Sequence, residues 1–462
     1  MKTHSYVLIV ALVAAISGIL FGYDTGVMSG AILFIAEDFV LTPGVNGIVM
    51  GSVLFGALAG AIFSGRATDY FGRRKLLLIV AFIFMFGALG TAIAPSIPLL
   101  TIGRIVVGIA IGVASYVGPL YISEMAPQKH RGALVALNQL AITAGILLSY
   151  IVDYYFSFTS NWRWMLGFGV IPGILLFLGM LYLPESPRWL LSHGEEEQAR
   201  KNLLPIRGSE ENVEREIANI KVTLKKEAAN WKIIFSKLVR PVLWIGFGLA
   251  FIQQVTGINT ILYYAPTILK MAGFGSASVS ILATMGIGAV MFVFTIVSLP
   301  LIDRWGRRPL LLAGLIGMGL SLGVLAFLFE SSSGIPASME WTGLVTMLVY
   351  IACFSFSLGP IMWLMIAEIY PLQVRGIGAS LATCANWCSN LLVTATFLKM
   401  VEWIGARGTF SLYAACCLLS IAFVYFLVPE TKGASLEMIE ENLFAGKPWR
   451  ELGSELTKVK FR

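Results

Sequence analysis

The sequence predicts an all-α membrane protein whose twelve transmembrane helices form two six-helix halves. Hydrophobic residues make up 57% of the 462 residues and charged residues only 13%, whereas about 25% of the residues in a soluble domain are charged. Apolar runs long enough to cross a ~30 Å hydrocarbon core recur twelve times. Short motifs also return in the same order in the second half. These observations exclude a soluble protein and a soluble domain with one anchor.

Each of the twelve runs has about 20 residues or more, the length that an α-helix needs to span a bilayer. A polar stretch rich in lysine and glutamate separates the sixth run from the seventh, and it is either a set of short amphipathic helices on the membrane surface or a linker. The predicted organisation is an N-terminal half at 1–184, an intracellular loop at 185–240, a C-terminal half at 241–429 and a cytoplasmic tail at 430–462. The runs lie at 6–36, 45–65, 76–95, 98–123, 133–156, 163–183, 242–270, 277–301, 309–329, 341–366, 377–400 and 407–428.

The distribution of Lys and Arg predicts the orientation. With the N-terminus in the cytoplasm, 28 of the 33 Lys and Arg residues fall on the inner side and four on the outer side, while Arg104 lies inside an apolar run. Because basic residues concentrate in cytoplasmic loops, both termini and the central loop are predicted to be cytoplasmic. The chain has no Asn-x-Ser/Thr sequon and a very short first outer loop, which favours a bacterial cytoplasmic membrane.

Three motifs at equivalent inner helix ends return in the second half. Their order is the same and their offsets, 234, 244 and 245 residues, are similar, which predicts two halves in parallel repeat. The pairs are Asp69–Arg74 with Asp303–Arg308, Glu124 and Arg131 with Glu368 and Arg375, and Pro184–Pro187 with Pro429–Lys432.

Cysteine and histidine positions indicate neither a metal site nor catalysis. The five cysteines lie in apolar runs without a CxxC pair, and the three histidines lie in polar connections. The net charge of +7 comes from basic loops, which reflect topology rather than nucleic-acid binding. The sequence therefore predicts a transporter without a metal, a cofactor or catalytic residues, and not an enzyme.

Eight motifs together make the chain resemble the sugar porter family of the major facilitator superfamily, from the first helix to the twelfth. The elements PESPRW, QQVTGIN and PETKG are specific to the sugar branch. The resemblance implies the major facilitator fold, with a substrate site between the halves and transport by alternating access. The motifs are Gly22–Gly26, Gly65–Arg74, Glu124–Gly132, Pro184–Trp189, Gln253–Asn259, Asp303–Arg308, Gly359–Trp363 and Pro429–Gly433.

Asp24 is an ionisable residue with apolar neighbours on both sides within the first helix, and such residues usually mark a pathway or a proton relay. Arg104 is the only formal charge within the fourth helix. Pairing would satisfy both groups and could link the pair to protonation. The resemblance implies that Asp24 takes up the transported proton, while a purely structural pair is the alternative.

Amide side chains can donate and accept hydrogen bonds at once, as a sugar with its many hydroxyl groups requires. The resemblance implies sugar contacts from Gln139, Gln253, Gln254, Asn259, Trp363 and Asn386, and an outer gate at Tyr263 and Tyr264. The alternatives are hydrogen bonds between helices for the amides, Asn390 included, and interfacial anchoring for the tyrosines.

The charged loop motifs predict an inner latch. Asp69 and Asp303 are expected to accept from helix N-terminal amides of opposing elements, and the other residues are expected to pair across the two halves. Such pairs would hold the inner side closed in the outward-facing state, whereas topology alone is the simpler explanation. The other residues are Arg73, Arg74, Glu124, Arg131, Arg307, Arg308, Glu368 and Arg375.

The predicted function is proton-coupled symport of a monosaccharide, a hexose or pentose such as glucose, galactose or xylose. Its partners are the sugar, the proton and membrane lipid, with no nucleic acid, and the protein is expected to act as a monomer. A facilitator that carries sugar without protons, a sugar sensor that does not transport, and a multidrug or organic-acid antiporter are the alternatives. The short tails count against a sensor, and the sugar-branch motifs count against an antiporter.

Overall fold

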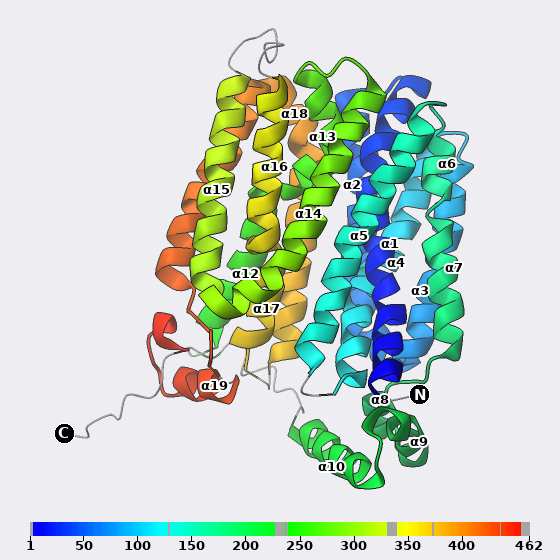
Figure 1. Ribbon diagram of the computed structural model, residues 1–462, viewed down its shortest axis with the longest axis vertical. Helices are drawn as coiled ribbons and strands as arrows, with labels where there is room; N and C mark the ends of the chain where they lie inside the picture. The colour runs from blue at the N-terminus through cyan, green and yellow to red at the C-terminus, as the bar shows by residue number, and fades with distance from the viewer. Residues whose placement is uncertain are drawn as a thin grey trace, which may run out of the picture. The chain divides into compact units, whose positions relative to one another are not determined.

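The computed structural model describes residues 3–127, 130–226, 236, 239–329, 340–371, 374–434 and 436–453 (Figure 1). Every regular element within these ranges is a helix. The chain packs as two compact units, which are described separately. Unit 1 comprises Met1–Ala228 with Ser276–Gly288, and unit 2 comprises Ala229–Gly275 with Ala289–Arg462.

Unit 1 contains the first six predicted spans. The sixth is divided at Phe168 and Gly169 into two helices that together form one span, Trp162–Tyr182. The helices are α1 (Thr3–Asp38), α2 (Pro43–Phe71), α3 (Arg73–Ala92), α4 (Ile97–Met125), α5 (Arg131–Ser157), α6 (Trp162–Gly167) and α7 (Val170–Tyr182).

Three short helices follow in the polar stretch: α8 (Pro187–Ser192), α9 (Glu196–Arg207) and α10 (Glu210–Lys226). The apolar faces of α9 and α10 pack against each other. Leu203 on α9 is buried in one cluster with Val213 and Ile217 on α10. Removing these apolar faces from water stabilises the pair, and the charged faces remain outside.

Unit 2 contains the remaining spans, two of which are broken. The seventh predicted span consists of α12 and α13, and the tenth consists of α16 and α17. The helices are α12 (Arg240–Val255), α13 (Ile258–Met271), α14 (Ala277–Trp305), α15 (Arg307–Leu328), α16 (Glu340–Phe356), α17 (Leu358–Ile369), α18 (Arg375–Leu427) and α19 (Leu436–Phe444), followed by a 3-10 turn at Trp449–Glu451.

The helix α18 accounts for two spans. Its apolar stretch Gly376–Leu427 has 52 residues, and a straight helix of that length would measure roughly 78 Å, more than twice the ~30 Å hydrocarbon core. The backbone is non-helical at Gly405, where φ is 73° and ψ is 166°. Ten other stretches of the described chain are long and apolar enough to span, so the prediction of twelve transmembrane helices is confirmed.

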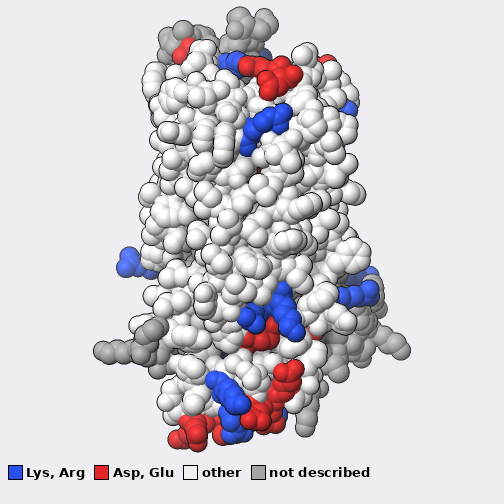
Figure 2. Space-filling model, turned by 90° about the vertical axis from the view of Figure 1, so that its right-hand side faces the viewer, with Lys and Arg blue, Asp and Glu red and all other residues white. Residues whose placement is uncertain are grey.

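Charged side chains follow the same pattern on the surface. On the face shown in Figure 2, Lys, Arg, Asp and Glu gather toward two ends, with a wide uncharged band between them. Uncharged side chains are what a lipid-facing surface requires.

The two units do not divide the chain at a single point, because the first part of α14 packs in unit 1. Ser157 on α5 donates a hydrogen bond to Ser278 at 3.0 Å. Further along α14, Gly288 lies against the ring of Tyr150, which a Cβ at that position would approach to 2.8 Å. The helix α14 therefore belongs partly to each unit.

In unit 1, α1 packs closely along α5 through glycines at four-residue spacing, Gly18, Gly22, Gly26 and Gly30 (Figure 1). Residues four apart lie on one face of a helix, so the glycines form one smooth stripe. A Cβ on Gly22 would collide with the backbone carbonyl of Ile142. The close approach of these two helices sets the surroundings of Asp24.

Candidate functional site

The structure brings Asp24 on α1 and Arg104 on α4 together within unit 1. The Arg104 guanidinium donates through Nη1 to Asp24 Oδ1. The exposed fractions are 5% for Asp24 and 1% for Arg104, so the pair is shielded from solvent. Among the described residues, Arg104 Nε and Nη2 have no hydrogen-bond partner. Asp24 is therefore the group that balances a buried cation, and its protonation would leave that cation unpaired.

In unit 2, both broken spans meet at the predicted sugar residues. Between α12 and α13, Gly257 has a φ of 91°, a left-handed conformation that glycine adopts without steric cost. Between α16 and α17, Ser357 has φ −122° and ψ −95°. Tyr350 on α16 donates to the Thr256 carbonyl at 2.9 Å. A backbone carbonyl at the break between α12 and α13 is thus satisfied by a side chain of the other broken span.

Proline lacks a backbone donor, so the Gly359–Pro360 step predicts a break in the tenth span, but the break lies slightly earlier, at Ser357. Pro360 is the third residue of α17, within the first turn, where the missing proline N–H has no intrahelical partner to lose. The break near Gly257 did not follow from the pattern, because residues 242–270 form one continuous apolar run.

Four of the six predicted sugar-binding residues form one buried amide network in unit 2. Gln254 donates to Gln253 Oε1 at 3.2 Å and to Asn386 Oδ1 at 3.1 Å. Asn386 donates to Gln253 Oε1 at 2.8 Å, and Asn259 donates to Gln254 Oε1. Gln253 also donates to the Leu358 carbonyl at 3.1 Å. The network ties both helix breaks to α18.

The other two predicted sugar residues lie outside this network. Gln139 is half-buried on α5 in unit 1. Trp363 on α17 in unit 2 is 38% exposed, so its ring is not enclosed in the core. Asn390, one turn after Asn386 on α18, accepts a local hydrogen bond from Thr394 at 3.0 Å.

The two tyrosines predicted as an outer gate are both buried on α13. The Tyr264 hydroxyl donates to the Thr394 carbonyl at 3.1 Å, and its ring packs against Phe397 with centroids 4.9 Å apart. Tyr263 is 2% exposed. Both residues are held inside the protein, so in this structure they are not interfacial anchors.

The inner end of unit 1 carries an ion-pair network. Arg73 binds Glu124 through two hydrogen bonds of 2.9 Å, the bidentate geometry that is strongest for this pair. Glu185 accepts from the backbone N–H of Arg73 at 2.9 Å and of Arg74 at 3.1 Å, which caps α3. Ser186 donates to Glu124. The PESPR motif thus fixes the start of α3 and the acidic end of α4.

Unit 2 repeats this network with equivalent residues. Arg307 binds Glu368 at 2.7 and 3.3 Å. Glu430 accepts from the backbone N–H of Arg307 and of Arg308, both at 3.0 Å, which caps α15. Thr431 donates to Glu368 at 2.5 Å. The glycine before each capped helix, Gly72 or Gly306, has a positive φ and leaves no room for a Cβ beside the capping glutamate.

These contacts correct the predicted latch in two respects. The partners of Arg73 and Arg307 come from their own halves rather than from opposite halves, because the inner ends of neighbouring helices in one half converge there. Within the part of the chain that the structure describes, Asp69 and Asp303 do not cap helices. Their side chains are more than 80% exposed, and each lies 3.8 Å from the arginine four residues later. The caps are instead Glu185 and Glu430, which lie in the PESPRW and PETKG motifs and were not among the predicted latch residues.

The remaining latch residues differ in what surrounds them. Arg74 donates to the Leu181 carbonyl at 2.7 Å, and Arg308 donates to the Tyr425 carbonyl at 2.5 Å. Arg131 is exposed at the first residue of α5. The Arg375 side chain lies outside the described residues.

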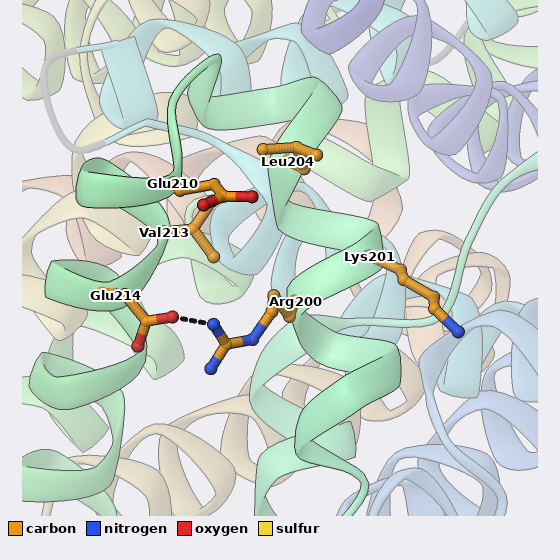
Figure 3. Close-up of a pocket in the computed structure, with 6 residues that line it drawn as sticks. All are labelled: Arg200, Lys201, Leu204, Glu210, Val213 and Glu214. Carbon is orange, nitrogen blue, oxygen red and sulfur yellow. Dashed lines mark hydrogen bonds and ion pairs between the residues drawn. The ribbon is translucent and has the colours of Figure 1, made fainter.

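A small surface pocket between α9 and α10 contains none of the predicted site residues. The Arg200 guanidinium reaches across it to the Glu214 carboxylate (Figure 3). Both side chains are about half exposed, and exposed ion pairs of this kind contribute about 0–1 kcal/mol. The pocket is part of the packing of the two helices. Its lining residues are Arg200, Lys201, Leu204, Glu210, Val213 and Glu214.

Comparison with known proteins gives consistent results over nearly the whole chain. A family model described as "Sugar (and other) transporter" matches residues 10–443. The D-xylose transporter of Levilactobacillus brevis is 45% identical, over 93% of this chain and 94% of its own length. The galactose-proton symporter of Escherichia coli is 40% identical, over 96% of each chain.

A solved structure extends the likeness to the fold. The xylose transporter XylE from Escherichia coli, in a partially occluded inward-open conformation, has a TM-score of 0.83 and 32% sequence identity. The match covers 93% of this chain and all of that chain.

Proposed function

The chain belongs to the sugar transporter family of the major facilitator superfamily, and we propose that it is a proton-coupled monosaccharide symporter that works by alternating access. The observation that carries the proposal is the buried ion pair between Asp24 and Arg104. An unpaired charge at that depth is costly, so the pair couples the protonation of Asp24 to the arrangement of α1 and α4. The named relatives that carry xylose or galactose support a sugar as substrate.

In the proposed cycle, a proton from the outer solution adds to the Asp24 carboxylate and forms a neutral carboxyl group. The hydrogen bond from Arg104 loses its charge assistance, and the guanidinium needs another acceptor. Sugar binding and protonation together shift the equilibrium between outward-open and inward-open states, because each ligand stabilises one state more than the other. Release of both on the inner side returns Asp24 to Arg104.

The amide network of unit 2 supplies most of the proposed sugar contacts, and Gln139 and Trp363 are the other two residues that we propose as sugar contacts. Gln253, Gln254, Asn259 and Asn386 now hydrogen-bond to one another. A sugar hydroxyl can donate and accept like an amide, so it can replace these bonds without leaving buried groups unsatisfied. The breaks at Gly257 and Ser357 let these spans bend as the network changes, since unwound backbone commonly forms transporter sites.

We also propose that the ion-pair networks at the inner helix ends brace each half, that the protein acts as a monomer, and that both termini face the cytoplasm of a bacterium. The excess of Lys and Arg in the predicted inner loops supports the orientation. Labelling of single introduced cysteines in intact cells, with a reagent that does not cross the membrane, tests it. Labelling of either terminus from outside would refute it.

The deciding experiment is uptake of labelled glucose, galactose and xylose into proteoliposomes. An imposed inward proton gradient should drive accumulation above the external sugar concentration, and an ionophore should abolish it. Asp24→Asn keeps an acceptor oxygen for Arg104 but cannot cycle a proton, so it should lose accumulation and keep sugar exchange. Asp38→Asn, at an exposed position at the end of the same helix, is the control and should accumulate sugar normally.

Each competing function predicts a different result. A facilitator equilibrates sugar to the external level with or without the gradient. A sensor binds sugar without uptake, and an antiporter of another substrate class neither binds nor moves it.

A further inference from the structure

Asp153 on α5 is a second buried carboxylate within the membrane-spanning part of unit 1. Its exposed fraction is 0%, and neither of its side-chain oxygens has a hydrogen-bond partner among the described residues. Asp24, by contrast, has Arg104. Burying an ionised carboxylate without a partner costs several kcal/mol or more, so such a group is neutralised instead. The burial of Asp153 therefore needs an explanation that the ion pair at Asp24 does not provide.

The backbone of Gly30 on α1 forms one wall of the site. A Cβ added to Gly30 would lie 2.5 Å from Asp153 Oδ2 and 2.8 Å from Asp153 Cβ. The carboxyl group thus occupies the space that the missing side chain leaves. The N–H of Gly30 faces the Asp153 carboxyl group, but it lies inside α1 and is already used in the helix hydrogen-bond ladder, so it makes no full hydrogen bond to either carboxyl oxygen. The carbonyls of the same helix can still accept a second hydrogen bond.

The described residues of the neighbouring elements offer no available cation. On α1, Tyr23 lies within electrostatic range of both Asp153 and Asp24, and its hydroxyl donates to the Met165 carbonyl at 2.7 Å. On α4, Arg104 is bound to Asp24.

The other elements packed on α5 give the same result. On α6, Arg163 donates to the carbonyls of Ala92 and Ala94 at 3.1 and 2.7 Å. The segment Ser276–Gly288, which contains the part of α14 in unit 1, has no ionisable side chain in its sequence. On α1, Glu37 and Asp38 are acidic and exposed, so they would repel a second carboxylate rather than neutralise it.

We infer that Asp153 is a second proton-binding site of unit 1 and is protonated in this conformation. One proton from the aqueous phase adds to one carboxylate oxygen, and no other bond is formed or broken. The resulting O–H is a donor and can bond to a backbone carbonyl of α1 or α5. The inference does not depend on the proposed transport, because the proton would be bound whether or not sugar moves.

Infrared spectroscopy of the purified protein in lipid bilayers tests this occupancy. A protonated carboxyl group absorbs apart from an ionised one, and its band shifts in heavy water. The wild type at neutral pH should show a protonated band that disappears at alkaline pH. Asp153→Asn should lack this band, whereas Asp24→Asn should retain it. Asp38→Asn removes an exposed carboxylate and should change only the ionised signal.

A band that persists unchanged in Asp153→Asn would overturn the inference, as would a band that only Asp24→Asn removes. If Asp153→Asn does not fold, Gly30→Ala provides a second test. It keeps Asp153 and places a methyl group against its carboxyl, so the protonated band should change frequency. Gly65→Ala, at a glycine with nothing within 4 Å of the added Cβ, should leave the band unmoved. An unmoved band in Gly30→Ala would contradict the assignment.

Sugar counterflow with equal pH on both sides gives a functional readout that does rest on the proposed function. Ionisation of Asp153 against the backbone of Gly30 should disturb the packing of α1 on α5. The wild type should therefore lose exchange at alkaline pH, and Asp153→Asn should retain it to a higher pH. If both proteins lost exchange over the same alkaline pH range, ionisation of Asp153 would be excluded as the cause of the loss. Absence of counterflow in every variant would count against the proposed function and leave the infrared result standing.

Discussion

At the residue scale, buried polar side chains of the two units are satisfied in different ways. Asp24 and Arg104 satisfy each other by charge, whereas the amides of unit 2 satisfy one another as neutral donors and acceptors. A neutral network exchanges partners at lower cost than a buried charge. This difference suits an ion pair to proton coupling and an amide network to a polyhydroxylated substrate.

The role of the network is tested by Asn386→Ala. The change removes a donor to Gln253 and an acceptor for Gln254. We expect sugar affinity to fall about ten-fold or more, which corresponds to about 1.4 kcal/mol, measured by calorimetric titration. The control is Asn390→Ala, one turn later on α18, where the side chain accepts only a local hydrogen bond from Thr394 in the contacts described. Equal loss of affinity in both variants would show that Asn386 has no specific role.

At the element scale, the position of Asp24 depends on how closely α1 approaches its neighbours. The glycines at 18, 22, 26 and 30 let its backbone contact α5 directly. Close packing of this kind is a main source of helix association in a bilayer, where lipid tails are as apolar as the side chains. Helix breaks also shape the protein at this scale. The breaks at Gly257 and Ser357 both lie beside the amide network.

The tight crossing predicts that Gly22→Ala destabilises the protein. The added methyl group meets the carbonyl of Ile142, a backbone atom that cannot rotate away, and overpacking typically costs about 1–3 kcal/mol. The midpoint of thermal unfolding in detergent should fall. Gly65→Ala on α2 adds the same methyl group where nothing lies within 4 Å, so its midpoint should stay unchanged or rise slightly. Similar midpoints for the two variants would contradict a close crossing at Gly22.

At the scale of the whole molecule, the internal repeat is visible as two copies of one network. Arg73, Glu124 and Glu185 in unit 1 correspond to Arg307, Glu368 and Glu430 in unit 2, with the same hydrogen bonds. Each copy joins the start of one helix to the ends of two others within its own unit. The charges therefore brace each half.

The repeat predicts matched effects of Glu185→Ala and Glu430→Ala. Each removes the acceptor for two backbone N–H groups at a helix start, so each should destabilise the protein by about 1–3 kcal/mol, measured by thermal unfolding. Glu211→Ala removes an exposed carboxylate and should change stability by less than about 0.5 kcal/mol. A large effect at only one of the two caps would mean that the halves are not braced equivalently.

Much of this protein followed from sequence because the bilayer limits the possible structures. A chain in hydrocarbon must satisfy its backbone hydrogen bonds internally, so apolar runs gave the twelve spans without knowledge of their packing. Asp24 and Arg104 stood out because charge is rare inside such runs. Polar amides are also costly inside such runs, and together with the family motifs this cost indicated the amides at 253, 254, 259 and 386. The structure joins these four by hydrogen bonds.

Tertiary structure decided which groups meet. The sequence contained Glu185 and Glu430 within recognised motifs, but only the folded chain shows their carboxylates at the starts of α3 and α15. It also shows that Arg73 and Arg307 find partners within their own halves, and that Asp153 is buried against Gly30. The reason is physical. Hydropathy reports the average environment of a segment, whereas a hydrogen bond depends on the position of two atoms to within a few tenths of an ångström, which only the packing of helices fixes.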